Sequence, residues 1–360
     1  MKILLRFVAI ILALILVISL PLVILAFDVG RVIFNPPLVK QVITEIVTES
    51  DLVPAALDWY SETRAKERYA GGEAEAWVEE PDIVSLIEFM GIVDWREIRW
   101  KVLTDEILAD WVSATVDGTY AWIDSDARVP DIQWSMANFI QQVNNERGIE
   151  SIEIAYSALP DCNPEQIADF KTRLEAAPPG SEVFYNLCRF PDPWYDDQFS
   201  DYVESLEMLI KNIPPSFDLT ERLSHVQDTA GVGPDMIKTQ LRLIRWMMRL
   251  APLIPLVLLI LILGLAVRSF KGYGRWWGTP LTIGGILTLL ITLVYRPLVT
   301  FVLTAGPLSE IPELIREEAL GGMLTLTAYI FTPMMWQSLV ILFIGLSLIL
   351  VGLFVKPRAE

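Results

Sequence analysis

The residues best suited to chemistry are gathered in an acidic segment at 190–202, FPDPWYDDQFSDY. Its carboxylates are those of Asp192, Asp196, Asp197 and Asp201. Hard cations such as Ca²⁺ prefer several carboxylate oxygens, but this spacing matches no dedicated metal-binding loop. A second acidic group is formed by Asp124, Asp126 and Asp131, and Val129 stands where an EF-hand loop requires glycine. We therefore expect solvated acidic faces and no metal site.

The sequence has few residues suited to a nucleophilic catalytic site. It contains a single histidine, His225, which lies in a polar stretch far from either cysteine. Zinc enzymes and serine or cysteine triads both depend on histidine. The sequence also contains no Walker loop, dinucleotide fingerprint, G-x-S-x-G or H-E-x-x-H motif. We expect no catalytic residues and no cofactor. An enzyme that uses a pair of carboxylates stays open as a third-ranked alternative.

Cys162 and Cys188 are the only cysteines. Between them, Asn163, Pro164 and Gln166 have the form of a helix N-cap, a first-turn proline and a capping-box partner, and the run at 177–180, APPG, ends the helix. Such a helix with a returning segment brings the two thiols together. A disulfide is predicted if this region lies outside the cytoplasm, and two buried free thiols are the alternative.

Net charge separates the chain into two kinds of sequence. Residues 28–245 contain 18 Lys and Arg against 40 Asp and Glu, a net charge of −22, whereas the remainder carries +5. A surface this acidic repels nucleic acid and favours cations or basic partners. We predict an acidic extramembrane domain at 28–245 that does not bind nucleic acid.

Apolar residues are concentrated outside that domain. Residues 1–27 contain a long apolar run behind Lys2 and Arg6, with no A-x-A cleavage pattern, which favours an uncleaved signal anchor. The segment 246–360 contains three further apolar stretches at about 250–267, 279–296 and 335–355. A helix of roughly 20 apolar residues crosses a hydrocarbon core. The sequence thus predicts four membrane spans, one before and three after the acidic domain.

A basic stripe precedes the second span. Lys238, Arg242, Arg245 and Arg249 recur at intervals of four, three and four, so they lie on one side of a helix. They could bind anionic lipid headgroups or dock onto the acidic domain. We favour a third interpretation, a generic basic flank at the membrane interface that sets the depth of the span.

Within the spans, Arg296 is the one serious candidate for a functional charge, and an interfacial position is the favoured interpretation. Proline follows it directly, and residues 298–303 are predicted to lie near the membrane surface. Residues 307–322 read as a polar segment and 323–331 as a second approach to the lipid. Gly264 and the pair Gly284-Gly285 are expected to permit close helix packing.

The acidic domain is predicted to be mainly α-helical, because its apolar residues recur at three and four. Asp94 and Glu97 resemble a capping box at the start of a helix whose apolar face runs from Trp100 to Trp111 and ends near Gly118. The tryptophans are expected to pack against neighbouring helices. The best strand candidate is Ile149 to Ala155, which alternates apolar and polar residues.

Basic residues suggest an orientation. Placing both termini in the cytoplasm puts seven basic residues of short segments inside: Lys2, Arg6, Arg268, Lys271, Arg275, Lys356 and Arg358. Against this, Arg296, Arg316 and the basic stripe then lie outside. Long domains translocate largely regardless of charge. We therefore predict a multi-pass plasma-membrane protein with residues 28–245 outside.

These features favour a non-catalytic envelope scaffold, sensor or assembly subunit. Its expected partners are membrane lipids and another envelope or membrane protein. The cytoplasmic segments are too short for an output module, so this protein would not signal alone. A subunit of a transporter or channel is the second candidate, since such proteins carry polar or ionisable residues within their spans.

Overall fold

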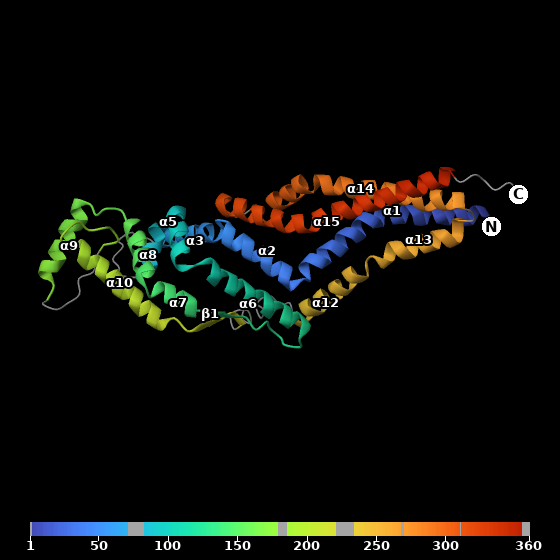
Figure 1. Cartoon of the computed structure of the whole chain (residues 1–360). Helices are drawn as coiled ribbons and strands as arrows, with labels where there is room; N and C mark the ends of the chain where they lie inside the picture. Colours follow the sequence, from blue (N-terminus) through green and yellow to red (C-terminus); the bar gives the residue numbers. More distant parts are fainter. Residues whose placement is uncertain are drawn as a thin grey trace.

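The computed structural model describes residues 2–70, 83–178, 186–220, 234–267, 270–309 and 311–354. These residues form a mainly helical, elongated molecule, with a membrane bundle at one end and a helical domain at the other (Figure 1). This confirms the predicted fold class in its coarse form. His225, Arg268, Lys356 and Arg358 lie outside the described residues.

Three helices are long and apolar enough to cross a membrane: α1 (Lys2–Ile33), α14 (Phe270–Ala305) and α15 (Glu313–Phe354). Helices α12 (Pro234–Leu250) and α13 (Leu253–Ala266) make a fourth candidate if they are counted as one span bent by 41°. The start of α1 and the end of α15 lie at the same end of the bundle (Figure 1). Three helices, or four with the bent pair, are thus long and apolar enough to cross a membrane, which is consistent with a multi-pass membrane protein.

The predicted span at 250–267 is not one straight helix. Its helix breaks between Leu250 and Leu253, because Pro252 has no amide hydrogen and restricts the residue before it. The 14 residues of α13 extend only about 21 Å, less than a hydrocarbon core of about 30 Å. A second crossing therefore requires part of α12, which runs across the predicted domain boundary at 245.

Helices α14 and α15 are much longer than the predicted spans at 279–296 and 335–355. With 36 and 42 residues they extend about 54 and 63 Å. Pro297 and Pro333 lie inside them, so both helices continue beyond the predicted span ends, and the polar residues from Glu313 onward and the apolar stretch at 323–331 belong to the one helix α15. The positions of the membrane boundaries along these helices stay a prediction. Contacts with neighbouring helices stabilise such proline-containing helices.

Small residues let the long helices approach closely. A Cβ on Gly285 would lie 3.0 Å from the Leu342 backbone nitrogen of α15, and one on Gly284 would lie 2.7 Å from the Leu20 side chain of α1. Close packing at this glycine pair agrees with the prediction. A Cβ on Gly264, in contrast, would meet no atom of the described residues within 4 Å, so Gly264 makes no such contact among them.

The other helices that the structure describes form the helical domain. In chain order they are α2 (Pro36–Glu49), α3 (Leu52–Ala70), α4 (Ile83–Leu86), η1 (Ile87–Phe89), α5 (Ile92–Val102), α6 (Asp105–Asp124), α7 (Ala137–Val143), α8 (Glu146–Ser157), α9 (Pro164–Ala176) and α10 (Tyr195–Asn212). Strands β1 (Gln133–Ser135) and β2 (Ser216–Asp218) pair antiparallel, with Trp134 opposite Phe217. The main core of this part includes Leu86, Trp95, Tyr156 and Tyr202.

Three local predictions are wrong. Residues 149–155 lie in helix α8 instead of a strand, since Ile152, Ala155 and Tyr156 face the core at helical spacing. The capping box begins at Gly91, three residues before the predicted N-cap Asp94, because Asp94 is the third residue of α5 and accepts from the Gly91 amide at 2.9 Å. The predicted helix from Asp94 to Gly118 is two helices, α5 and α6.

The tryptophans of α6 and β1 pack as expected. Trp111 and Trp134 stack with ring centroids 5.0 Å apart. The Trp134 indole donates to the Thr115 hydroxyl at 2.9 Å, and the Trp122 indole donates to the Arg128 carbonyl at 3.0 Å. Helix α6 continues past Gly118, where a Cβ would lie 2.3 Å from the Asp131 carbonyl oxygen. Gly118 therefore serves a close backbone approach and does not end the helix.

Candidate functional site at the junction of the membrane helices and the helical domain

The carboxyl end of α6 is covered by side chains from α12. The last carbonyls of a helix have no partner within the helix and carry partial negative charge. Arg242 donates through Nε to the Ile123 carbonyl at 2.7 Å and through Nη2 to the Ser125 carbonyl at 2.6 Å. Lys238 donates to the Ser125 carbonyl at 3.1 Å and to the Ala127 carbonyl. Two cations therefore bind one helix end.

This contact is largely shielded from solvent at Lys238, whose exposed fraction is 4%. The ammonium also lies 5.5 Å from the centroid of the Trp122 ring. A buried cation is stable only where hydrogen bonds and opposite partial charge replace its water. The carbonyls of Ser125 and Ala127, at and just beyond the end of α6, supply both, so the position of α12 against this helix end is strongly specified.

The third residue of the stripe, Arg245, makes an ion pair with Asp124 at 2.5 Å and lies 5.0 Å from the centroid of the Phe34 ring. It thus joins α12 to α6 and to the segment that links α1 with α2. Arg249 is exposed and lines a crevice of about 230 Å³ with Arg31 and Met248. The structure therefore brings three of the four stripe residues onto the acidic domain, and the membrane-interface role of the stripe stays a prediction.

Helix α1 is attached to the same helix α6. The Tyr120 hydroxyl donates to the Ile33 carbonyl at the end of α1, and Lys40 of α2 pairs with Asp117 at 2.6 Å. Burial raises the pKa of the Tyr120 phenol, and this keeps it as a hydrogen-bond donor at neutral pH. Helices α1 and α12 thus converge on α6 near the base of the domain.

Helix α15 forms a third attachment on another side of the domain. Its first turns lie against α2 and α3 (Figure 1). A Cβ on Gly322 would lie 2.8 Å from the Ile46 side chain, so the Ile46 side chain of α2 packs directly onto α15 at this glycine. Helices α1, α12 and α15 therefore all contact the helical domain directly.

Asp28 is an ionisable residue of the bundle that the sequence reasoning missed. It is 1% exposed and accepts from the Gln337 amide of α15 at 2.9 Å. Its second oxygen, Oδ2, has no hydrogen-bond partner within the part of the chain that the structure describes. The available signal was its place, directly after the apolar run of residues 7–27.

Arg296, which the sequence singled out, is exposed on α14, and its Nε donates to the hydroxyl of the adjacent Tyr295 at 3.3 Å. The Tyr295 ring stacks on Phe331 of α15 at 4.3 Å. The structure thus places Arg296 beside the α14–α15 contact. Its interfacial role stays a prediction.

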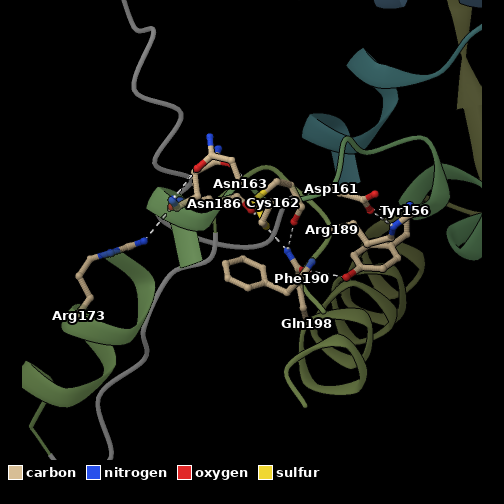
Figure 2. The surroundings of a disulfide bond; sticks show 11 residues. Tyr156, Asp161, Cys162, Asn163, Arg173, Asn186, Arg189, Phe190 and Gln198 are labelled. Atoms are coloured by element: carbon tan, nitrogen blue, oxygen red, sulfur yellow. Dashed lines mark hydrogen bonds and ion pairs between the residues drawn. A yellow bond between two sulfur atoms is a disulfide. The ribbon is translucent and has the colours of Figure 1, made fainter. Parts of the chain in front are cut away.

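The far end of the domain is closed by the predicted disulfide between Cys162 and Cys188, which is present (Figure 2). The predicted helix between the cysteines is also confirmed: it is α9, with Asn163 as N-cap and Gln166 completing the capping box. The bridge packs with Phe170, Phe190 and neighbouring apolar side chains in a small core. This core is separate from the main one.

Gln198 of α10 holds the segment around Cys188 in place. Its amide donates to the Cys188 carbonyl at 3.0 Å, and its oxygen accepts from the Tyr156 hydroxyl at 2.6 Å and the Phe190 amide at 3.2 Å. Gln198 is fully buried. Figure 2 shows how these partners surround it. Sequence reasoning missed this residue, because nothing local marks one glutamine of an acidic helix as buried.

The acidic groups proposed from sequence are not brought together as ligands. In the described ranges, no group of three or more His, Cys, Asp or Glu side chains is placed to hold a metal ion. Asp124 is engaged by Arg245, and Asp192, Asp196 and Asp197 are exposed. Comparisons of the chain with protein-family models, with curated proteins and with solved structures find no match.

Proposed function

We propose that this chain is a non-catalytic membrane scaffold or assembly subunit that holds an acidic helical domain for another envelope protein. The observation that carries the proposal is the junction in which Lys238, Arg242 and Arg245 of α12 bind the carboxyl end of α6. Buried charge-assisted hydrogen bonds fix the relative position of two helices. A subunit that presents a docking surface needs such a fixed position.

The other attachments support the same proposal. Helices α1 and α15 also contact the extramembrane helices, so the domain is joined to the bundle on more than one side. The disulfide and Gln198 close the far end of the domain. A rigid surface binds a partner without a large loss of conformational entropy.

Charge supports a basic partner. Several carboxylates on α9 and α10 are exposed: Glu165, Glu175, Asp196, Asp197, Glu204 and Glu207. Complementary potentials guide association and exclude wrong partners. A protein with a basic surface therefore fits this end of the molecule, and nucleic acid does not.

The proposed location is a plasma membrane, with residues 28–245 on the side opposite both termini. Lys2, Arg6 and Arg275 belong to short segments at the end of the bundle where α1 begins, which agrees with a cytoplasmic position for that end. A disulfide persists in oxidising compartments, which agrees with an extracytoplasmic domain. Modification of a Glu175→Cys variant by a membrane-impermeant maleimide in intact cells tests this orientation.

Site-specific cross-linking tests the scaffold function. A photo-activated amino acid at Glu204 of α10 is expected to capture one envelope protein in cells, and the variant Asp196→Lys/Asp197→Lys is expected to lose that product. The matched control is the same cross-linker at Asp126, an exposed acidic position near α12. Equal capture from Asp126, or capture that survives charge reversal, would contradict the proposal.

Transport is a second candidate, and Asp28 is the observation that favours it. A buried carboxylate with one unpartnered oxygen, on a helix long and apolar enough to cross a membrane, is typical of ion and proton pathways. Proton or cation flux into liposomes that is abolished by Asp28→Asn, and preserved in Arg296→Ala, would replace the scaffold proposal. Absence of flux in the unmodified protein would remove this candidate.

A further inference from the structure

A cavity lies between the long apolar helices, where nothing above assigns a ligand. It has a volume of about 690 Å³ and lies between α1, the end of α13 and the start of α14. This is within the range of roughly 300–1,000 Å³ typical of small-molecule sites. Most of its walls are apolar, and two arginines, Arg6 and Arg275, line it as well.

Both long helices turn one face toward the cavity. From α1 the lining includes Arg6, Ile10 and Val17, at helical spacing. From α14 it includes Arg275 and Ile283, again at helical spacing. On each helix these apolar residues come after the arginine in the sequence. Each helix therefore contributes a charged group at one end of the cavity and apolar side chains along the rest of it.

The two arginines lie at the same end of the cavity. Helices α1 and α14 run in the same direction and meet where a Cβ on Gly284 would touch Leu20. Arg6 precedes Leu20 by about 21 Å of helix, and Arg275 precedes Gly284 by about 14 Å. Both guanidinium groups therefore belong to the outer end, near the start of α1.

The depth of the cavity matches one leaflet of a bilayer. The rise from Arg6 to Val17 along α1 is about 16 Å. Half of a hydrocarbon core of about 30 Å is about 15 Å. Trp276 also lines the cavity next to Arg275, and tryptophan side chains prefer the headgroup level of a membrane.

Among the described residues, no acidic side chain lines this end of the bundle. The sequence contains no Asp or Glu in 1–27 or in 246–309, and the cavity lining contains none. Arg6 and Arg275 are exposed, and neither makes an ion pair within the residues that the structure describes. Two such guanidinium groups beside an apolar cavity are complementary to a phosphate that carries an alkyl chain.

From this we infer that the cavity is a binding site for one phospholipid with a net negative headgroup, whose phosphate is held by Arg6 and Arg275 and whose acyl chain lies along α1 and α14. A zwitterionic lipid fits less well, because its amine would lie beside two cations. The inference requires that α1 and α14 lie in a membrane. It does not depend on which side the acidic domain occupies or on the scaffold function.

Native mass spectrometry of the full chain tests the inference. Purified protein in detergent is titrated with phosphatidylglycerol and, separately, with phosphatidylcholine of the same acyl chains. We expect one saturable phosphatidylglycerol adduct and no saturable phosphatidylcholine adduct. Arg275→Gln and Arg6→Gln are each expected to weaken the adduct about fivefold, and the double variant about 25-fold.

Matched variants separate this site from general attraction. Arg296→Gln removes an exposed arginine of the same helix α14 outside the cavity and is expected to leave binding unchanged. Ala13→Phe fills the cavity and is expected to abolish the adduct, whereas Leu22→Phe changes an exposed residue of α1 outside it. Unchanged protection of α6 amides against hydrogen exchange confirms that each variant is folded.

Three outcomes would overturn the inference. Equal binding of phosphatidylcholine and phosphatidylglycerol would show that charge does not select the lipid. An equal loss in Arg296→Gln and Arg275→Gln would show that the cavity is not the site. Complete competition by glycerol phosphate, which lacks an acyl chain, would show a free phosphate site in place of a lipid site.

Discussion

The two ends of the helical domain are stabilised by different chemistry. At the end nearer the long apolar helices, cationic side chains of α12 bind carbonyls at and just beyond the end of α6, across 111 to 119 residues of sequence. At the far end, a disulfide and the buried amide of Gln198 join segments that are 10 to 42 residues apart. The first end depends on charge and distant contacts, and the second depends on a covalent bond and local contacts.

The two ends should therefore respond to different treatments. Reducing agents should loosen the far end and leave the junction intact. Removal of positive charge should loosen the junction and leave the far end intact. Local opening measured by amide hydrogen exchange separates the two, because proteins open in cooperative units with their own free energies.

Removal of the disulfide should have the largest effect. The cysteines are 26 residues apart, and a cross-link over such a loop stabilises by about 3.5 kcal/mol in the chain-entropy model. We expect Cys162→Ser/Cys188→Ser to lower the opening free energy of α9 amides by that amount. The amides of α6 serve as the internal control. A similar loss of protection in α6 would show that the two ends are one cooperative unit.

Removal of the buried ammonium group of Lys238 should have the second-largest effect. Hydrogen bonds to charged groups contribute about 1.5–3 kcal/mol, and Lys238→Met leaves the Ala127 carbonyl without its ammonium donor. We expect the opening free energy of the last turn of α6 to fall by about 2 kcal/mol, with no change at α9. Arg249→Met is the matched control, because Arg249 is an exposed residue of the same helix. An equal effect of the control would point to a loss of helix propensity.

The ion pair between Arg245 and Asp124 should matter much less. The Asp124 side chain is 60% exposed, and ion pairs at exposed positions contribute about 0–1 kcal/mol. We expect Asp124→Asn to lower protection at the junction by about 0.5 kcal/mol in dilute buffer. The loss should disappear in concentrated salt, because salt screens exposed charges. A salt-independent loss would indicate that Asp124 stabilises the helix end through its backbone geometry.

The smallest effect should come from Asp58 of α3, and it should depend on pH. Burial, with the nearby carboxylates of Glu62 and Asp94, raises the pKa of Asp58. The folded state therefore favours the protonated carboxyl, so stability is gained as pH falls through the raised pKa and is lost as pH rises through it. We expect Asp58→Asn to raise the Tm slightly at neutral pH and to have no effect in acid.

Glu62→Gln is the companion variant for this prediction. It removes one of the two repelling carboxylates and should give a part of the same rise in Tm, again only near neutral pH. A rise in Tm that persists in acid would show that charge at Asp58 is not the cause. The disulfide-closed far end should show no such pH dependence, which would extend the contrast between the two ends.

Parts of the site were predictable because their signals are local. Asn163 and Gln166 cap α9 through contacts three residues apart, and two lone cysteines on either side of a helix can pair. The one-sided spacing of the basic stripe likewise follows from helix geometry. The binding partner of the basic stripe could not be predicted in this way, because the carbonyls at the end of α6 belong to the backbone and the sequence of side chains does not reveal them.

Other failures came from signals that support two structures. Residues 149–155 alternate like a strand, yet they also place Ile152 and Ala155 on a helical face, and packing against α5 and α10 selects the helix. Pro297 lies where the third span was predicted to end, yet α14 continues through it because α14 and α15 pack together over most of their length.

The amino-acid sequence alone determined the mainly helical class, the separation of apolar from acidic segments, and the pair of cysteines that closes the far end. These follow from composition and from spacings within one or two helical turns. Only the tertiary structure decided that Lys238 is buried on α6, that Asp28 meets Gln337, and that Arg6 and Arg275 line one cavity. Each of those contacts joins residues more than 100 positions apart, whose meeting depends on how whole helices pack.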